Sequence, residues 1–589
     1  MVELLILWGY MLLVNGCIGA GVLKGFSGLS RRLASGGRKG KTSITSINDK
    51  EKDSLGFPFG MAAVLLAGVV AITVYAQVFS LFGRVSAAAH LLLIVFAAVA
   101  AYWCRAELLA AWKRYRRILL SWEGVLYLSF AVMTAYFASR GLQHTDTGIY
   151  HAQMIRWYEE YGIVPGLANL QQHFGYNSAY LAYAAMFSMK WLLGQSLHGT
   201  TGFFQAFLVI WALYGLKSFQ SHKSHLADGC RAAILLYAIV VSERIMSPAT
   251  DFGAMYLVFW IVCLWTKTAC EREAGKEEKT ELYALLCVAV VCVTTYKLSA
   301  GMLVLLALYP AILLIRQKEW KRIGLYVAAG LAVLIPWLVR NVVLTGWLIY
   351  PFEAVNLFSV DWKVPLELMQ HDADQIKAWG RCLYDAGRIG EPISAWLPVW
   401  WGEKDRHEIM LLAANGIAVL LTAAAAVYRL ICRKKYEWDR VILYAAVLAG
   451  IAGWFFTAPF IRYGLAFLLI LPCMAVGEWL RPVKMGPVRI VSGFGIAAVF
   501  FSMSMYWDYY VLFDLVWVKQ HLTDPAWVIQ QDYDRVETGE MEVEGGLTVF
   551  YPLEGDNISY HAFPGTAYKT MAETCRMRGS SVRDGFMPK

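Results

Sequence analysis

The chain has 589 residues, of which 58% are hydrophobic, 14% aromatic and only 16% charged. Soluble globular proteins carry about 25% charged residues, so this composition excludes an ordinary soluble domain and indicates a membrane protein. The net charge is +9. Its basic residues are concentrated in short loops between apolar runs, which argues against a nucleic-acid partner.

Apolar runs near the length of a membrane-crossing helix recur along the chain. They lie at residues 3–23, 58–82, 87–103, 119–138, 201–217, 229–247, 252–267, 281–295, 298–315, 324–344, 410–428, 440–457, 464–480 and 488–512. These runs predict an all-α polytopic membrane protein with about 14 transmembrane helices. The first run lacks the basic start of a secretory signal peptide and is followed by further runs, so we expect a retained helix.

Lysine and arginine gather in alternate loops, which predicts the orientation of the chain in the membrane. The basic loops carry Arg31, Arg32, Arg38, Lys39 and Lys41; Arg105, Lys113, Arg114, Arg116 and Arg117; Lys217 and Lys223; Lys267, Arg272, Lys276 and Lys279; and the stretches 316–322, 429–440 and 481–489. The positive-inside rule makes these loops cytoplasmic and leaves both termini extracytoplasmic. The segment 177–194 is apolar enough to cross but would invert every later loop, so we expect a helix held in the outer leaflet.

Polar residues stand at helix ends on the predicted extracytoplasmic side. The stretch 145–178, directly after the fourth apolar run, is rich in Asp, His, Tyr, Asn and Gln. Ionisable groups near hydrocarbon are costly unless they are paired or hydrated, so a set gathered on one face predicts a functional site. The candidate site residues are Asp146, Tyr150, His151, Asp251, Lys297, Arg340, Asn341 and Arg462.

Three of these residues also have ordinary structural interpretations. Lys297 at a helix end can extend its ammonium group to lipid headgroups. Asp251 in "SPATD" can cap the following helix, and Asp146 can cap an amphipathic helix over 148–161. Capping and catalysis are compatible, since a carboxylate at a helix start is held rigidly.

The residue types match one reaction, the transfer of a sugar from a lipid phosphate. Asp146, a carboxylate at the membrane surface, can act as general base toward an acceptor hydroxyl or amine that attacks the anomeric carbon. The developing charge of the leaving phosphate requires cations, and a guanidinium binds two phosphate oxygens at once. Lys297, Arg340 and Arg462 are the predicted phosphate clamp, and the apolar helices are expected to hold the polyprenyl tail. No Walker motif, dinucleotide fingerprint or zinc-protease motif occurs in the sequence, and neither a cofactor nor a metal is expected.

Several motifs resemble known families. The run of "DTGIYH", "IRWYEEYGIVPGLANLQQHFGYNS", "SPATD", "YKLSA", "RNVVLTGWLIYP", "TAPFIRYG" and "RMRGSSVRDGF" resembles an uncharacterised family of bacterial membrane proteins over residues 140–589. The early extracytoplasmic loop, with an Asp shortly before aromatic residues, resembles the C-type (GT-C) fold of membrane glycosyltransferases that use polyprenyl-phosphate sugars. The chain departs from their commonest pattern, because its single Asp is followed by Thr-Gly-Ile-Tyr without a second acid. It also has three spans ahead of the span that is first in that fold.

The resemblance implies a GT-C-like fold and divides the chain into five regions. These are 1–118, N-terminal transmembrane helices with basic cytoplasmic loops; 119–344, a GT-C-like core with the extracytoplasmic loop 140–200; 345–409, an extracytoplasmic loop; 410–512, C-terminal transmembrane helices; and 513–589, a small extracytoplasmic α/β tail domain. The implied function is that of an integral glycosyltransferase in the bacterial inner membrane. Its implied partners are a polyprenyl-phosphate-linked sugar, membrane lipid, and an extracytoplasmic glycan or lipid acceptor.

Two other functions remain open. O-antigen polymerases and other polysaccharide polymerases or ligases also act on lipid-linked glycans, but they usually place their arginines in a large late loop. Here the acid comes early and the late loop holds few basic residues. A transporter of lipid-linked glycans is expected to show repeated halves and polar groups at mid-membrane. The sequence has no internal repeat, and its polar residues lie at one predicted face.

The remaining outer regions carry structural expectations. Asp372 and Asp374 are expected in a solvated helix start, and the stretch after "EVEG" in the tail is strand-like. The tail is too short to bury a large core alone, so we expect it to dock on the outer face. The eleven cysteines show no metal-ligand spacing and are expected to pack, although Cys382 and Cys575 can pair.

Overall fold

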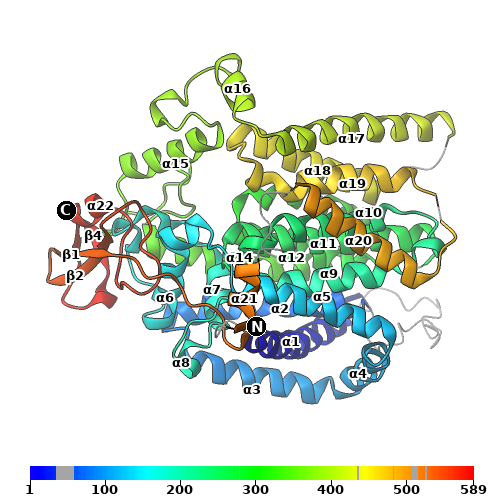
Figure 1. Cartoon of the computed structure of the whole chain (residues 1–589), viewed down its shortest axis with the longest axis horizontal. Helices are drawn as coiled ribbons and strands as arrows, with labels where there is room; N and C mark the ends of the chain where they lie inside the picture. The colour runs from blue at the N-terminus through cyan, green and yellow to red at the C-terminus, as the bar shows by residue number, and fades with distance from the viewer. Residues whose placement is uncertain (35–58, 277–278, 434–436, 482, 506–514, 524–526) are drawn as a thin grey trace.

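The computed structural model is a bundle of long helices with a small tail of mixed structure at one end (Figure 1). It describes residues 1–34, 59–276, 279–433, 437–481, 483–505, 515–523 and 527–589. The basic residues Arg38, Lys39 and Lys41 and the end of the run predicted at 488–512 lie outside the described residues.

The first part of the chain forms helices along one side of the bundle. They are α1 (Val2–Ala34), α2 (Met61–Phe82), α3 (Ala87–Trp103), α4 (Arg105–Leu119) and α5 (Trp122–Ser139). Helix α1 packs along α2, and α3 and α4 meet at an angle of 86°. Helix α4 carries the basic residues of one predicted cytoplasmic loop, so this loop is itself helical.

The polar stretch after α5 folds into short elements. They are a π-helical turn η1 (Thr147–His151), α6 (Ala152–Glu160), η2 (Leu167–Asn169), η3 (Gln172–Tyr176), α7 (Ala179–Met186) and α8 (Lys190–Leu193). The segment 177–194 is therefore two short helices, interrupted at Met189, whose φ is +54°. An eight-residue helix rises only about 12 Å, which is short of the roughly 30 Å hydrocarbon core of a bilayer, and the location of this segment in the outer leaflet stays a prediction.

The middle of the chain forms the core of the bundle. Its elements are α9 (Thr200–Leu216), η4 (Phe219–Ser221), α10 (Leu226–Val240), η5 (Ser242–Arg244), α11 (Thr250–Glu273), α12 (Thr280–Tyr296), η6 (Leu298–Ala307), α13 (Leu308–Arg316) and α14 (Trp320–Thr345). Helix α11 is central, since 94% of its apolar window is buried against neighbours that include α10 and α12. Its middle, residues 252–265, is apolar on all sides and has no polar face to present to water, whereas Asp251 lies in its first turn and Arg272 in its last.

The later helices cover another side of the bundle. They are α15 (Leu366–Gly380), η7 (Ala386–Arg388), α16 (Ile393–Gly402), α17 (Arg406–Ile431), α18 (Trp438–Thr457), α19 (Ile461–Trp479), α20 (Pro487–Met505) and α21 (Leu515–Thr523). Only 11% of the apolar window of α17 is buried, so this helix presents its leucines and isoleucines outward. An exposed apolar helix of this length fits contact with lipid better than contact with water.

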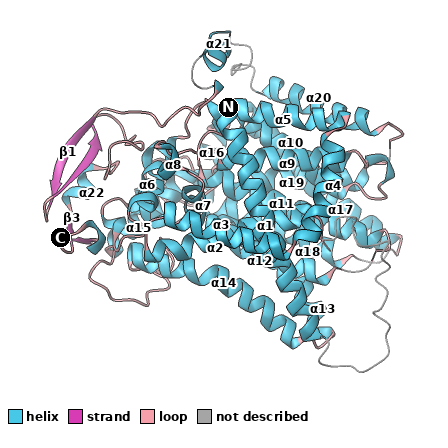
Figure 2. Ribbon diagram, turned by 90° about the horizontal axis from the view of Figure 1, so that it is seen from below, coloured by secondary structure: helices cyan, strands magenta, loops and turns pink. Residues whose placement is uncertain are grey.

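The tail holds all the named strands of the described residues, and they lie together at one end of the molecule (Figure 2). Strand β1 (Thr538–Val543) pairs antiparallel with β2 (Leu547–Pro552), with Thr538 opposite Pro552. Strand β3 (Cys575–Met577) pairs antiparallel with β4 (Phe586–Pro588), and the short helix α22 (Lys569–Glu573) precedes β3. The strand predicted after "EVEG" is therefore confirmed as β2.

Among the described residues, eight helices are long and apolar enough to cross a membrane, and the bent pair α3 and α4 would make a ninth. The eight are α1, α2, α11, η6 with α13, α14, α17, α18 and α19. Helices α9 and α12 are apolar but have 17 residues each, which is short of the ~20 residues that a typical bilayer requires. The number of apolar candidate spans is thus lower than the predicted count of about 14, because helices such as α10 end inside their apolar run.

Two expectations about the outer regions are wrong. Asp372 is only 1% exposed and accepts hydrogen bonds from the Tyr176 hydroxyl at 2.9 Å and Gln172 Nε2 at 3.3 Å. It faces inward from the middle of α15, whereas a solvated helix start was expected. Cys382 and Cys575 are both free and buried, so they do not form a disulfide.

Candidate functional site

Four segments that are far apart in the sequence bring charged side chains together at one end of the bundle. Asp146 precedes η1, Asp251 lies in the first turn of α11, Lys297 separates α12 from η6, and Arg462 lies in the first turn of α19. His144 joins them from the loop after α5. We call these residues the acid–base cluster.

Arg462 is the centre of the acid–base cluster. Its Nη1 lies 2.8 Å from His144 Nε2, and its Nη2 donates to Asp146 Oδ2 at 3.0 Å. Its Nε lies 3.4 Å from Asp251 Oδ2, which is an ion-pair distance without a hydrogen bond. The guanidinium therefore contacts both acids and one histidine.

Lys297 completes the acid–base cluster from the opposite side of Asp251. Its ammonium group contacts Asp251 Oδ1 and lies 3.9 Å from the ring centroid of Tyr463. Two carboxylates thus face the Arg462 guanidinium and the Lys297 amine. Burial, followed by Arg462, lowers the pKa of Lys297 well below its ordinary value. The interpretation of Lys297 as a residue that extends to headgroups is wrong, because its charge is directed to Asp251.

The environment sets the protonation of the acid–base cluster. Burial by itself raises the pKa of Asp146, but Arg462, followed by His144, outweighs it and lowers this pKa to about 2. Burial lowers the pKa of His144 to about 4, against the opposing effect of Asp146. At neutral pH the carboxylate is therefore ionised and the imidazole is neutral. A neutral imidazole accepts a hydrogen bond at only one of its two ring nitrogens. Arg462 Nη1 approaches Nε2 of His144, and the backbone amide of Asp146 approaches Nδ1 at 3.1 Å. The tautomer of His144 therefore decides which of the two donors is accepted.

Aromatic and imidazole rings form a wall beside Asp146. Tyr150 stacks on His173 with ring centroids 5.2 Å apart and lies 4.2 Å from the ring of His151. His151 is fixed between the hydroxyl groups of Thr147 at 3.3 Å and Thr250 at 3.4 Å. Burial lowers the pKa of His151 well below its ordinary value. These predicted site residues therefore adjoin the acid–base cluster as neutral, rigid side chains.

Arg340 and Asn341 have other partners. Arg340 is fully buried in α14, donates through Nη2 to the Tyr158 hydroxyl, and stacks 5.0 Å from that ring. Asn341 accepts from Asn177 Nδ2 at 2.8 Å and donates to the carbonyl of Leu348 at 3.0 Å. Within the described part of the chain, neither side chain forms a hydrogen bond or an ion pair with the acid–base cluster. The structure therefore assembles Lys297 and Arg462 of the predicted clamp and leaves Arg340 outside it.

Neither carboxylate serves as a helix cap. Asp146 makes no side-chain hydrogen bond to the turn that follows it, and the predicted helix over 148–161 begins instead with the π-helical turn η1. Asp251 lies inside α11, whose N-cap is Ala249. Both capping interpretations are wrong, because ion pairing to Arg462 and Lys297 takes these carboxylates. Single π-helical turns often occur at functional sites.

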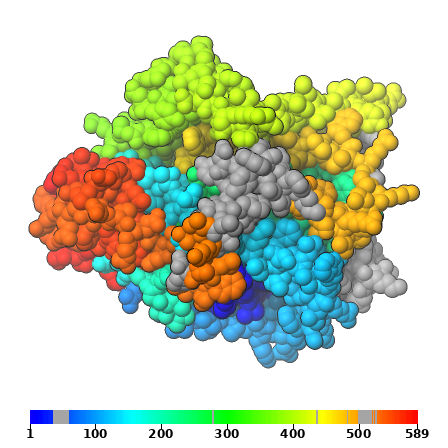
Figure 3. Space-filling model, in the orientation of Figure 1, coloured from blue at the N-terminus to red at the C-terminus, as the bar shows by residue number. Residues whose placement is uncertain are grey.

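The tail packs against the segment that carries Asp146, and in Figure 3 the orange and red tail lies beside the cyan part of the chain. The carbonyl of Gly148 accepts from the amides of Ile558 at 3.1 Å and Ser559 at 2.8 Å. A Cβ atom at position 148 would come within 2.4 Å of Asn557 Oδ1, so glycine permits this close approach. Gln153 adds bonds to the carbonyls of Ser559 at 2.9 Å and Ala562 at 2.8 Å. The tail therefore packs on the polar stretch, and its location on the outer face stays a prediction.

Three ligand-type side chains in the acid–base cluster are close enough to hold a metal ion. The ligand atoms of His144, Asp146 and Asp251 lie within 4.8 Å of one another. Arg462 contacts all three residues. A metal ion bound between these three residues would have to displace the Arg462 guanidinium, because two cations repel each other at this distance. The acid–base cluster therefore suits an anion that replaces a carboxylate on Arg462 better than it suits a metal ion.

Sequence reasoning missed two members of the site. His144 stands two residues before Asp146 in "QHTD", and Tyr463 follows Arg462 directly. Their proximity to predicted site residues was a usable signal. The contribution of the tail had no comparable signal, because it depends on contacts between segments about 400 residues apart, such as Arg156 and Tyr560, for which the separation is 404 residues.

Comparison with known proteins gives one family. No curated protein and no solved structure matches the chain. The model of a family described as "Domain of unknown function (DUF8201)" matches residues 1–469, a range that contains every member of the acid–base cluster. The chain therefore belongs to the DUF8201 family.

Proposed function

We propose that this protein is an integral membrane glycosyltransferase that moves a sugar from a polyprenyl-phosphate donor to a glycan or lipid acceptor. The proposed reaction takes place at the acid–base cluster, on the extracytoplasmic side of the bacterial inner membrane, with both termini on that side. One observation carries the proposal: the Asp146 carboxylate is held 3.0 Å from Arg462 Nη2, at the end of apolar helices.

Anion exchange at Arg462 would activate Asp146. A lipid phosphate that binds Arg462 and Lys297 replaces the carboxylates on those cations. Arg462 is the largest influence that lowers the pKa of Asp146, and burial opposes it. Release from Arg462 therefore raises the pKa of Asp146 from about 2 toward neutrality, where a general base is most effective.

The proposed step balances in protons and charge. The acceptor oxygen attacks the anomeric carbon, and the bond from that carbon to the phosphate oxygen breaks. The acceptor proton passes to Asp146. The negative charge that develops on the leaving polyprenyl phosphate is stabilised by Arg462 and Lys297.

An apolar groove next to the turn that precedes Arg462 suits the lipid tail. It has a volume of about 680 Å³, within the range of small-molecule sites, and lies between α16, α17, α18 and α19. Its walls include Trp400 and Trp454, whose indoles donate to the carbonyls of Pro459 and Phe460 at 2.7 Å each. The groove therefore adjoins the turn that leads into Arg462, which supports a substrate with a charged head and a hydrocarbon chain.

The decisive experiment uses the full-length protein purified in lipid nanodiscs. It is incubated with a panel of polyprenyl-phosphate hexoses and pentoses and an envelope extract as acceptor, and released polyprenyl phosphate is measured by mass spectrometry. We expect release from at least one donor by the wild type, none by D146N, and wild-type release by D374N, a matched change on α15. Equal release by D146N and the wild type would contradict the proposal. A transporter of lipid-linked glycans would move the donor without releasing lipid phosphate.

Topology is tested separately with an impermeant thiol reagent in intact cells. A cysteine introduced at position 390, which is exposed in the predicted extracytoplasmic loop, should be labelled, and one at position 110 should be labelled only after permeabilisation. The reverse pattern would place the acid–base cluster on the cytoplasmic side and would exclude an extracytoplasmic acceptor.

A further inference from the structure

A second group of chemically active side chains lies near the opposite end of α19. Arg462 is in the first turn of α19, whereas Gly477, 15 residues later, packs on the backbone of His225. At 1.5 Å per residue these points are about 23 Å apart. His222 and His225 lie in the connection between α9 and α10, and Asp228 lies in the first turn of α10. Nothing in the proposed reaction uses these three residues.

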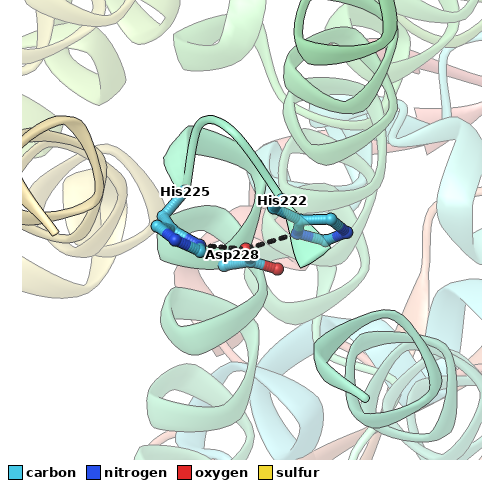
Figure 4. A group of neighbouring side chains, drawn as sticks. All are labelled: His222, His225 and Asp228. Carbon is cyan, nitrogen blue, oxygen red and sulfur yellow. Dashed lines mark hydrogen bonds and ion pairs between the residues drawn. The ribbon is translucent and has the colours of Figure 1, made fainter. Parts of the chain in front are cut away.

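The two imidazoles converge on one carboxylate oxygen (Figure 4). His222 Nδ1 lies 2.7 Å and His225 Nδ1 lies 2.8 Å from the same Oδ2 of Asp228. All three ligand atoms lie within 4.8 Å of one another. We propose that His222, His225 and Asp228 bind a divalent transition-metal ion of the zinc type, with water completing the coordination.

The ligand chemistry selects the ion. Zinc takes imidazole nitrogen and carboxylate oxygen at about 2.0–2.2 Å, and an open zinc site has three protein ligands and one water. Magnesium and calcium prefer all-oxygen ligands. Two nitrogens and one oxygen therefore favour zinc, and the hydrogen-bonded distances require only small movements to admit it.

Neighbouring residues hold the ligands in place. Arg231 Nη1 binds the other oxygen of Asp228 at 2.5 Å, which leaves Oδ2 for the ion. The ring of His225 is fully buried and stacks on Phe219 with centroids 4.0 Å apart at 24°. Supporting contacts of this kind orient metal ligands and raise affinity. The side chain of His222 is 28% exposed, which gives an ion access from solvent.

The contrast with the acid–base cluster strengthens the assignment. Both groups combine histidine with aspartate. Arg462 contacts each of the three ligand residues of the acid–base cluster, so a cation already fills it. Arg231 instead contacts only Asp228 among the three residues, and on the oxygen that faces away from the imidazoles. An ion between the three ligand atoms would replace the two hydrogens that the Nδ1 atoms donate to Asp228 Oδ2, and each imidazole would then carry its proton on Nε2.

The test measures zinc binding by the purified full-length protein without any lipid-linked donor, so its result is independent of the proposed transferase activity. Protein stripped with a chelator is titrated with Zn²⁺ against a fluorescent indicator, and retained metal is counted by mass spectrometry. We expect one Zn²⁺ per chain with micromolar or tighter affinity, little competition from Mg²⁺, and cobalt absorption bands typical of mixed nitrogen and oxygen ligands.

Variants separate a metal site from a hydrogen-bonded brace. His222→Gln changes a partly exposed residue and should weaken Zn²⁺ binding by about tenfold or more while the melting temperature without metal is retained. Asp228→Asn should weaken it similarly, and the metal-dependent rise in melting temperature should disappear in both variants. His371→Gln, an exposed histidine on α15, is the matched control and should bind like the wild type. Absence of stoichiometric zinc, or equal affinity in His222→Gln and His371→Gln, would overturn the proposal.

Discussion

Both ends of the helix bundle carry ion pairs with a buried aspartate, but the two sets differ in how many of their polar atoms form hydrogen bonds. At the α18 end, Asp439 is fully buried and accepts from Arg272 Nη2 at 2.7 Å, Arg272 Nε at 3.1 Å and the Tyr283 hydroxyl at 2.8 Å. In the acid–base cluster, Asp251 Oδ2 and Arg462 Nε face each other without a hydrogen bond. A saturated ion pair stabilises packing, whereas a pair with free hydrogen-bonding capacity can exchange partners with a ligand.

The largest effect is expected for a substitution in the acid–base cluster. Asp146→Asn keeps the size of the side chain and an oxygen for Arg462, but the amide cannot take a proton. Transfer should fall by roughly 10²- to 10⁴-fold with little change in melting temperature. Release of polyprenyl phosphate and thermal unfolding measure the two quantities on one preparation. Full activity of D146N would remove Asp146 as the base, and Asp251 would become the candidate.

The corresponding change at Asp439 should lower the stability of the protein and leave its activity unchanged. Asp439→Asn removes the negative charge of a fully buried residue that Arg272 and Tyr283 contact, and Arg272, whose side chain is 25% exposed, keeps only Glu437 as an acidic partner. Breaking a fully buried ion pair costs about 3–5 kcal/mol, which is an upper limit for this partly exposed one. The melting temperature in detergent should therefore fall strongly, while the fraction that remains folded keeps its activity. If D439N loses activity at an unchanged melting temperature, the two ends do not divide into structural and functional roles.

The buried Asp372 predicts a pH dependence of stability outside the acid–base cluster. Burial raises the pKa of Asp372 from 3.8 to about 6. The folded protein therefore binds more protons than the unfolded chain between about pH 4 and pH 6, and stability falls as pH rises through this window. The total change approaches about 3 kcal/mol.

Asp372→Asn should remove this slope, because the amide keeps the bonds from Tyr176 and Gln172 without titrating. Melting temperatures of both proteins across pH 4–8 provide the measurement. A slope that persists unchanged in D372N would assign it to other groups.

The smallest expected effect concerns the docking of the tail. Gln153→Leu removes two bonds to the carbonyls of Ser559 and Ala562 and one from the amide of Gly565 at 3.2 Å. Each unsatisfied buried group costs about 1–3 kcal/mol. Limited proteolysis should therefore cut within residues 527–560 faster in Q153L than in the wild type, with the core intact. Gln375→Leu, on the exposed face of α15, is the matched control. Equal cleavage rates would show that the tail is held by other contacts.

Local sequence patterns predicted which stretches are helical more reliably than they predicted where each helix begins and ends. Each of the fourteen apolar runs overlaps a described helix, since a run of apolar residues needs no distant partner to indicate burial in protein or lipid. The ends were less predictable. Helix α10 ends at Val240 rather than at 247, and the stretch 148–161 begins with a π-helical turn. Helix ends depend on packing with neighbours, which the run itself does not encode.

The sequence by itself also determined that Asp146, Asp251, Lys297 and Arg462 stand at helix ends, because an ionisable residue beside an apolar run is visible without a structure. Only the tertiary structure decided their partners. Arg462 reaches Asp146 across 316 residues, and Arg340, which has the same chemistry, bonds to Tyr158 instead. The physical reason is that an ion pair requires two groups within a few ångströms, and the packing of α11, α12 and α19 sets which groups meet.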